Sequence, residues 1–120
     1  MRYRFSDLFT ERLSLAEQKA RKLLLRHLSA EQLEMYKQVN GLVVKGPSGK
    51  YYFVTAHSFY LIRGTSLVRY YCLEPSKEMP EEDWLLAKIL LLQGAEDYAL
   101  RTAYSETCTI DTHFLRRAYA

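Results

Sequence analysis

The sequence predicts an α+β domain, with two N-terminal helices, a three- or four-stranded antiparallel β-meander and C-terminal helices packed on the sheet. Two changes of pattern predict this class. Apolar residues recur every three or four positions before residue 40 and again after residue 80, which is the period of helices. Between residues 41 and 73 the period is two, and β-branched and aromatic residues are frequent, as in strands. A chain of 120 residues that is 48% hydrophobic is expected to form a single domain, 1–120.

The helical part is expected to cover residues 1–40. The first helix should end near Leu28, and its start has two alternatives: the apolar stripe begins at Phe5, whereas Ser14 and Glu17 have the form of a capping box. A second helix is expected over residues 30–39. The capping-box pattern recurs just before it, and Asn-Gly supplies a left-handed stop just after it.

The meander is expected over residues 41–73, with strands near 42–45, 50–55, 59–63 and 67–73. The stretch "GPSG" between the first two strands is typical of a hairpin loop. Pro47 presets φ for the turn, and Gly49 takes the position that needs a positive φ. The adjoining strands therefore pair as a hairpin.

The C-terminal helical part is expected over residues 81–104, where Gly94 separates a long apolar helix from a shorter one. The tail, 105–120, has no clear period. Asp111 would cap a last short helix there, and that helix could cover the sheet.

The order of these features resembles a family of short, functionally uncharacterised proteins of bacteria and their phages. The resemblance covers about residues 22–104, and these residues carry it: Gly46, Gly49, Tyr52, Val54, Cys72, Leu73, Pro75, Pro80, Leu85, Leu86, Ala87, Lys88, Leu100, Arg101 and Ala103. The resemblance implies a fold and no activity. Relatives often have His at the position of Glu74 and basic residues at those of Tyr51 and Phe53, so a metal or phosphate role resting on those positions does not carry over.

The resemblance also places Tyr52 and Val54 on the core side of the sheet. Alternation then sends these residues to the opposite face: Tyr51, Phe53, Tyr60, Ile62, Val68 and Tyr70. That face is too apolar to stay in water. Three coverings are open: the tail through Ile110, Phe114 and Leu115, another protein chain, or stacked bases of a single strand. They rank in that order, because cover from the same chain costs no association entropy.

The charges are divided along the chain. Residues 1–28 hold seven Lys/Arg and three Asp/Glu, whereas residues 74–97 hold seven acids and two bases. Helical spacing places four of the basic residues on one ridge beside the apolar stripe: Arg12, Lys19, Lys22 and Arg26. The ridge is expected to be a solvated flank or to face the acidic segment 78–83. Phosphate contacts are the alternative, which the net charge of only +3 disfavours.

The long C-terminal helix is apolar almost all round, so it must be covered on more than one side. It is either the central helix of the monomer or part of a homo-oligomer contact. The contact would include some of Trp84, Leu85, Lys88 and Leu92.

No motif of a nucleophile, phosphate loop or metalloprotease occurs, so neither an enzyme nor a cofactor is expected. The histidines and cysteines lack the paired spacing of a metal site, and no metal is expected. Cys72 and Cys108 are expected to stay thiols, and a single disulfide between them is the alternative. No apolar run has membrane-spanning length and no signal peptide is recognisable, which predicts a cytoplasmic protein.

The expected function is therefore a non-catalytic protein-binding module: an adaptor, inhibitor or assembly component of the kind that phages and mobile elements encode. Its binding surface would be the aromatic sheet face, at Tyr51, Phe53, Tyr60, Ile62 and Tyr70. The alternative is a nucleic-acid-binding module that uses the basic ridge together with the sheet tyrosines.

Overall fold

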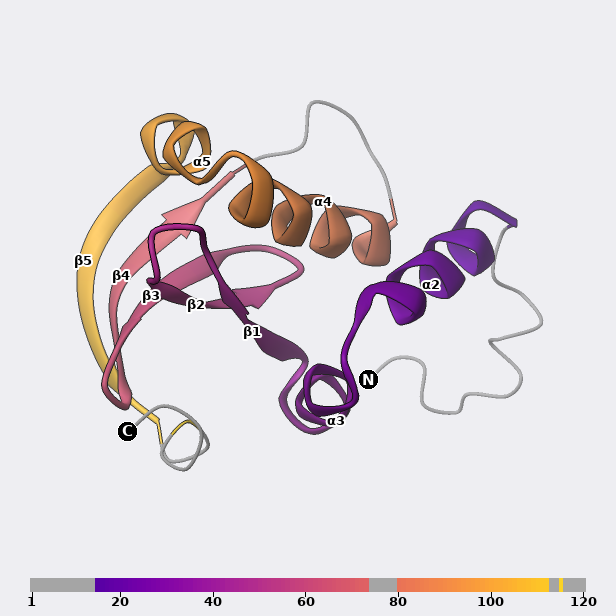
Figure 1. Cartoon of the computed structure of the whole chain (residues 1–120), viewed down its shortest axis with the longest axis horizontal. Coiled ribbons are helices and arrows are strands. Elements are labelled where there is room, and N and C mark those ends of the chain that lie inside the picture. Colours follow the sequence, from indigo (N-terminus) through magenta and orange to yellow (C-terminus); the bar gives the residue numbers. More distant parts are fainter. Residues whose placement is uncertain (1–14, 74–79, 113–114, 116–120) are drawn as a thin grey trace.

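A computed structural model describes residues 15–73, 80–112 and 115, and it has the predicted α+β architecture (Figure 1). The helices are α2 (Leu15–His27), α3 (Ala30–Val39), α4 (Glu81–Gly94) and α5 (Glu96–Thr102). The strands are β1 (Gly41–Lys45), β2 (Tyr51–Thr55), β3 (Phe59–Arg63), β4 (Ser66–Cys72) and β5 (Tyr104–Asp111). Within the described ranges, no helix combines the length and the apolar character needed to cross a bilayer.

The second N-terminal helix begins and ends where its sequence signals predict. Ser29 and Gln32 form a reciprocal capping box at the start of α3, with hydrogen bonds of 3.0 and 3.1 Å. Asn40 ends the helix with a φ of 60°, and its N–H donates to the Tyr36 carbonyl. The first helix reaches His27, close to its predicted end, whereas both predicted starts, at Phe5 and at Ser14, lie outside the described residues.

The strands form one antiparallel sheet in the order β1-β2-β3-β4-β5. The first hairpin is confirmed: Gly49 has a φ of +94°, and its N–H donates to the Gly46 carbonyl over 3.0 Å. A positive φ of this kind is strained for a residue with a Cβ, so glycine is required at position 49.

The fifth strand corrects the expectation for the tail. The sequence predicts three or four strands and a short helix at best after residue 105, but β5 extends the sheet beside β4. Its residues are exposed along most of the strand, because it lies at the sheet edge with little packed on either side. A strand without a buried face needs no alternation of apolar and polar residues, so the sequence of β5 carries no period-two pattern by which it could be predicted.

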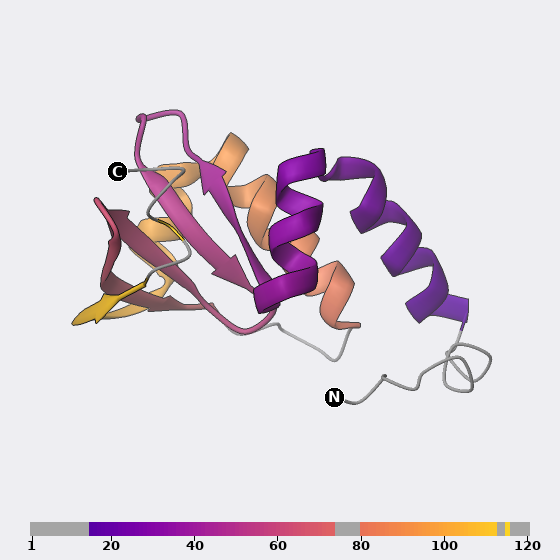
Figure 2. The same cartoon turned by 90° about the horizontal axis from the view of Figure 1, so that it is seen from below.

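One face of the sheet packs against α4 and carries the main core. Tyr52 and Val54 are buried on this face, as predicted, together with Phe59, Tyr71, and Leu42 and Val44 of β1. The rings of Phe59 and Tyr71 stack across β3 and β4 at 4.8 Å. Helix α2 lies along α4, and α3 lies along β1 at the sheet edge (Figures 1 and 2).

Helix α4 is the central helix of the chain, and the self-association prediction for it needs correction. Leu85 and Leu92 are fully buried between the sheet and α2, and Lys88 is only 1% exposed. Trp84 is half-buried. Leu85, Lys88 and Leu92 are therefore covered by the chain itself and are not available to a second subunit, whereas Leu90 on the same helix is 46% exposed.

A buried carboxylate fixes the first hairpin loop to α5. Glu96, 7% exposed, accepts hydrogen bonds from the Ser48 N–H (2.9 Å), the Ser48 hydroxyl (2.7 Å) and the Tyr52 hydroxyl (2.5 Å). Burial raises the pKa of Glu96, but these hydrogen bonds and the charge of Lys50 outweigh it, so the pKa lies below its ordinary value. A Cβ added to Gly46 would lie 2.6 Å from the carboxyl carbon of Glu96, so the loop needs a glycine there as well.

Candidate functional site

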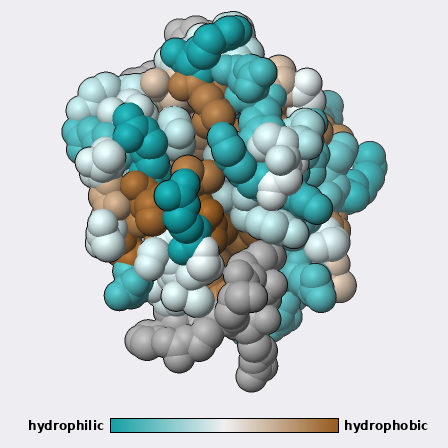
Figure 3. All heavy atoms as spheres, turned by 60° about the vertical axis from the view of Figure 1, so that its left-hand side comes forward, coloured by the Kyte–Doolittle hydropathy of each residue, from teal (hydrophilic) through white to brown (hydrophobic). Residues whose placement is uncertain are grey.

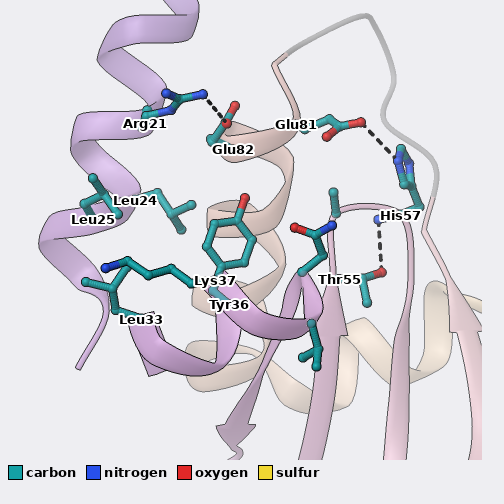
Figure 4. A pocket seen from close by; sticks show the side chains of 13 residues that line it. Arg21, Leu24, Leu25, Leu33, Tyr36, Lys37, Thr55, His57, Glu81 and Glu82 are labelled. Carbon is teal, nitrogen blue, oxygen red and sulfur yellow. Dashed lines mark hydrogen bonds and ion pairs between the residues drawn. The ribbon is translucent and has the colours of Figure 1, made fainter. Parts of the chain in front are cut away.

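A groove lies where α2 and α3 diverge, closed on its far side by the turn after β2 and the start of α4 (Figure 4). Its volume is about 730 Å³, within the range of sites that take a ligand or a segment of another protein. We call it the α2–α3 groove and define its apolar floor by Leu24, Leu25, Leu33, Tyr36 and Val39.

Helical spacing brings the floor residues together. On α2, Arg21, Leu24 and Leu25 are three and four positions apart, so they share one side of the helix. On α3, Leu33 and Tyr36 follow the same spacing. Figure 4 shows the Leu24 side chain of α2 beside the Tyr36 ring of α3, and Leu24 is fully buried there. Leu25 remains 43% exposed, so the floor is apolar and open to solvent.

The rim carries charges of both signs. Arg21 pairs with Glu82 over 3.6 Å, and His57 pairs with Glu81 over 3.2 Å (Figure 4). The first pair joins the basic N-terminal region to the acidic start of α4, but it is made by Arg21, which is not one of the predicted ridge residues. Lys37 is exposed and makes no ion pair with another described residue. The His57–Glu81 pair is exposed and therefore stabilises the fold little, whereas the Arg21–Glu82 pair is partly buried.

The basic ridge lies on the outer side of α2, next to the groove. Lys19, Lys22 and Arg26 are exposed, and none forms an ion pair within the described part of the chain. Arg12, the fourth predicted member, lies outside the described residues. At 100° per residue, Lys22 and Arg26 both lie on the side of Leu25 that faces away from Leu24, so the positive charge borders one side of the apolar floor.

A buried lysine supports the wall of the groove. The Lys88 ammonium donates a hydrogen bond to the Ala56 carbonyl in the turn after β2 and lies 4.7 Å from the centre of the Trp84 ring. Burial lowers the pKa of Lys88 to about 7, while the Cys72 and Glu81 charges oppose this shift. Such a pKa is typical of catalytic lysines. At 1% exposure, however, this amine reaches no ligand, and its place in the fold is to hold the turn against α4.

The aromatic face of the sheet is partly covered by the chain's own tail. Leu115 is fully buried there, in a second cluster with Val43, Phe53, Ile62 and Leu67. This is the covering that ranks first in the sequence analysis, carried by Leu115, whereas Ile110 stays 44% exposed in β5. Phe114 lies outside the described residues.

This cover changes which sheet residues are accessible. Phe53 and Ile62 are 7% and 8% exposed, so a partner cannot reach them while Leu115 is in place. Tyr51, Tyr60 and Tyr70 are half-buried, and the Tyr60 and Tyr70 rings lie 5.5 Å apart.

A bulge in β4 changes the predicted membership of this face. Val68 is an extra residue between two registers of pairing with β3, so Leu67, and not Val68, enters the buried cluster. The simple alternation from which Val68 was placed beside Tyr70 fails at that point.

The α2–α3 groove is not among the sites that the sequence predicts. The spacing of its floor residues on each helix was a usable signal, but which helices diverge is a tertiary property. Among the described residues, no three His, Cys, Asp or Glu side chains are placed to hold a metal ion, and Cys72 and Cys108 are free thiols.

Comparison with protein-family models, with curated proteins and with solved structures gives no match. The α2–α3 groove therefore has to be interpreted from its own geometry.

Proposed function

We propose that the protein is a non-catalytic protein-binding module whose α2–α3 groove takes an acidic amphipathic helix of a partner protein. The observation that carries this proposal is an open apolar floor directly beside a basic helix surface. The proposal keeps the function expected from the sequence and moves its site from the sheet to the helices.

The shape of the groove favours a helix as its occupant. Two helices that diverge present ridges on both sides, and a third helix can lay its apolar face between them. Leu25 and Tyr36 would then contact apolar residues at positions i, i+3 or i+4 and i+7 of the partner. Burial of the exposed part of Leu25 stabilises such a complex, at about 25 cal/mol for each Å² removed from water.

The charges favour an acidic partner. Lys22 and Arg26 are exposed on α2 and Lys37 lines the groove from α3, while Glu81 and Glu82 are already paired with His57 and Arg21. Acidic residues on the solvent side of the partner helix would therefore meet cations that make no ion pair within the described chain. Charges at such a rim mainly speed association and select the partner.

The same arrangement argues against a nucleic-acid strand that uses both predicted features. The basic ridge is on α2, on the α4 side of the sheet, whereas Tyr60 and Tyr70 point from the opposite face. A strand stacked on the tyrosines would have to pass around the sheet edge to reach Lys22 or Arg26.

The experiment is a selection from a displayed peptide library on the purified protein, with each enriched peptide then measured by fluorescence anisotropy. We expect enriched peptides to be acidic, with apolar residues at helical spacing, and to lose at least about tenfold in affinity for Leu25→Glu. Leu23→Glu is the matched control, because Leu23 is 41% exposed on the same helix and does not line the groove.

Two results would overturn the proposal. One is a set of enriched peptides that bind Leu25→Glu as well as the native protein. The other is binding of labelled single-stranded DNA or RNA that is lost in Tyr60→Ala and unchanged in Leu25→Glu, which would favour the nucleic-acid alternative.

A further inference from the structure

The two edges of the sheet differ in how they are protected. At the β1 edge, α3 lies alongside the strand, and the Gln32 side chain donates to the Val43 carbonyl over 2.9 Å. A backbone acceptor at that edge is therefore already used, and the helix blocks the approach of another strand.

Within the described part of the chain no helix lies along the β5 edge, and its one irregularity is a register shift in the pairing with β4, where Cys108 and Thr109 stand against Val68 alone. Strand β5 pairs with β4 on one side and is the last strand of the sheet on the other. It has 8 residues, and it contains no Lys, Arg or Pro of the kind that guards natural edges. Figure 3, which brings the β5 side forward, shows hydrophobic patches between the hydrophilic side chains of this side.

We propose that β5 is a dimerisation strand: two copies of the chain pair antiparallel through β5, so that their sheets become one continuous sheet. One open edge on each copy favours a two-fold pair over a fibre, because the protected β1 edge offers no site for a third copy. The occupant is a second copy because the strand complements itself, as its side chains show. This inference is independent of the α2–α3 groove.

The side chains of β5 select one register. Tyr104 and Ile110 are its exposed large apolar residues, at 60% and 44%, and they lie on the same face of the strand. If the two-fold axis passes through Thr107, Tyr104 of each copy lies directly opposite Ile110 of the other. Aromatic and β-branched residues form favourable cross-strand pairs, so this register removes both exposed apolar side chains from water.

Neighbouring registers are less favourable. An axis through Glu106 would set two carboxylates directly opposite one another. An axis through Cys108 would place Glu106 opposite Ile110 and leave Tyr104 without a partner. In the Thr107 register Glu106 faces Cys108, and the two glutamates are not opposite each other.

The test uses charge at the axis. Thr107 is exposed, so Thr107→Lys and Thr107→Glu should each leave the fold intact, as circular dichroism and thermal melts would check. By sedimentation equilibrium we expect the native chain to dimerise and each variant alone to dissociate, with a dissociation constant at least roughly tenfold higher, because the axis sets two like charges opposite each other. An equimolar mixture of the two variants should recover the dimer as a Lys–Glu heterodimer. Gln93→Lys, an exposed change of the same charge on α4, should dimerise like the native chain.

Each other outcome overturns part of the proposal. A native chain that stays monomeric at millimolar concentration rejects the dimer. Variants that dimerise as well as the native chain reject β5 as the interface. Variants that dissociate alone and do not recover on mixing reject the axis at Thr107.

Discussion

Tyr52 and Glu96, 44 positions apart in the sequence, are joined inside the molecule by a hydrogen bond of 2.5 Å. The bond ties the second strand to the start of α5, and the same carboxylate holds Ser48 in the hairpin loop. Because Glu96 accepts from three donors, its charged form is the one that fits the site.

We predict that Glu96→Gln lowers the free energy of unfolding at pH 7 by about 1–3 kcal/mol, because the amide cannot accept all three hydrogen bonds. The pKa of Glu96 is lowered in the folded state, so its contribution is present above the ordinary value of 4.5 and is lost as the pH falls through the folded value. Urea denaturation at pH 7, 5 and 3 should therefore show the difference between native and variant narrowing below pH 4.5. A constant difference over this range would contradict the assignment of a charged Glu96.

Alanine substitutions at two glycines, one in the hairpin loop and one at the end of α4, should affect stability differently. Gly46→Ala should destabilise the fold by about 1–3 kcal/mol, because the new methyl group collides with the Glu96 carboxylate. Gly94→Ala is the matched control: no atom lies within 4 Å of its added Cβ, and alanine favours helix, so a gain of about 0.5–1 kcal/mol is expected. Equal effects in thermal melts would argue against the close approach at Gly46.

The buried lysine predicts a pH dependence of the same sign as that of Glu96, in a higher pH range. Burial lowers the pKa of Lys88 to about 7 from 10.5, so between these values the unfolded chain binds a proton that the folded chain does not. The free energy of unfolding should therefore rise with pH from 7 to about 9.5, by up to about 3 kcal/mol. Above pH 10 the raised pKa of Tyr52 acts the other way, so the measurement stops below it.

The variant for this test is Lys88→Met, which has similar length and no charge. Urea denaturation of Lys88→Met should give an unfolding free energy nearly independent of pH between 7 and 9.5. A rise as steep as that of the native chain would show that another group is responsible.

The burial of Leu115 predicts that two leucine-to-alanine substitutions will lower the free energy of unfolding by different amounts. Leu115→Ala should cost about 2–4 kcal/mol, because Leu115 is fully buried against Phe53 and Ile62. Leu90→Ala should change stability by less than about 1 kcal/mol, since Leu90 is 46% exposed on a helix. Denaturant midpoints of the two variants measure the contrast, and a mild effect at Leu115 would mean that the tail does not seal this face.

Local signals predicted local structure well. Ser29 with Gln32 set the start of α3, Asn40 its end, and Gly49 the first turn, because each acts through bonds or backbone angles within a few residues. The side chains of β2 also alternate between the two faces of the sheet as predicted, because β2 pairs with β1 and β3 without a bulge.

The features that the sequence did not predict depend on contacts between residues far apart in the chain. The exposure of β5 removed its alternation, the extra residue at Val68 shifted the face of β4, and the lysine in α4 gave no sign that it would be buried. The α2–α3 groove depends on the angle between two helices that look like ordinary amphipathic segments when read alone. The carboxylate of Glu96 has the position of a helix-start acid, and its hydrogen bonds to Ser48 and Tyr52 are not encoded locally.

The late position of β5 in the chain has a consequence for synthesis on the ribosome. Cys108 donates to the Leu67 carbonyl of β4 across 41 residues, so the neighbour of β4 is translated well after β4 itself. At about 5–20 residues per second, the outer side of β4 waits roughly 2–8 s for its partner strand. During that interval a nascent chain on a crowded polysome carries an unpaired strand close to identical neighbours, and a chaperone that shields it then would raise the yield of native protein.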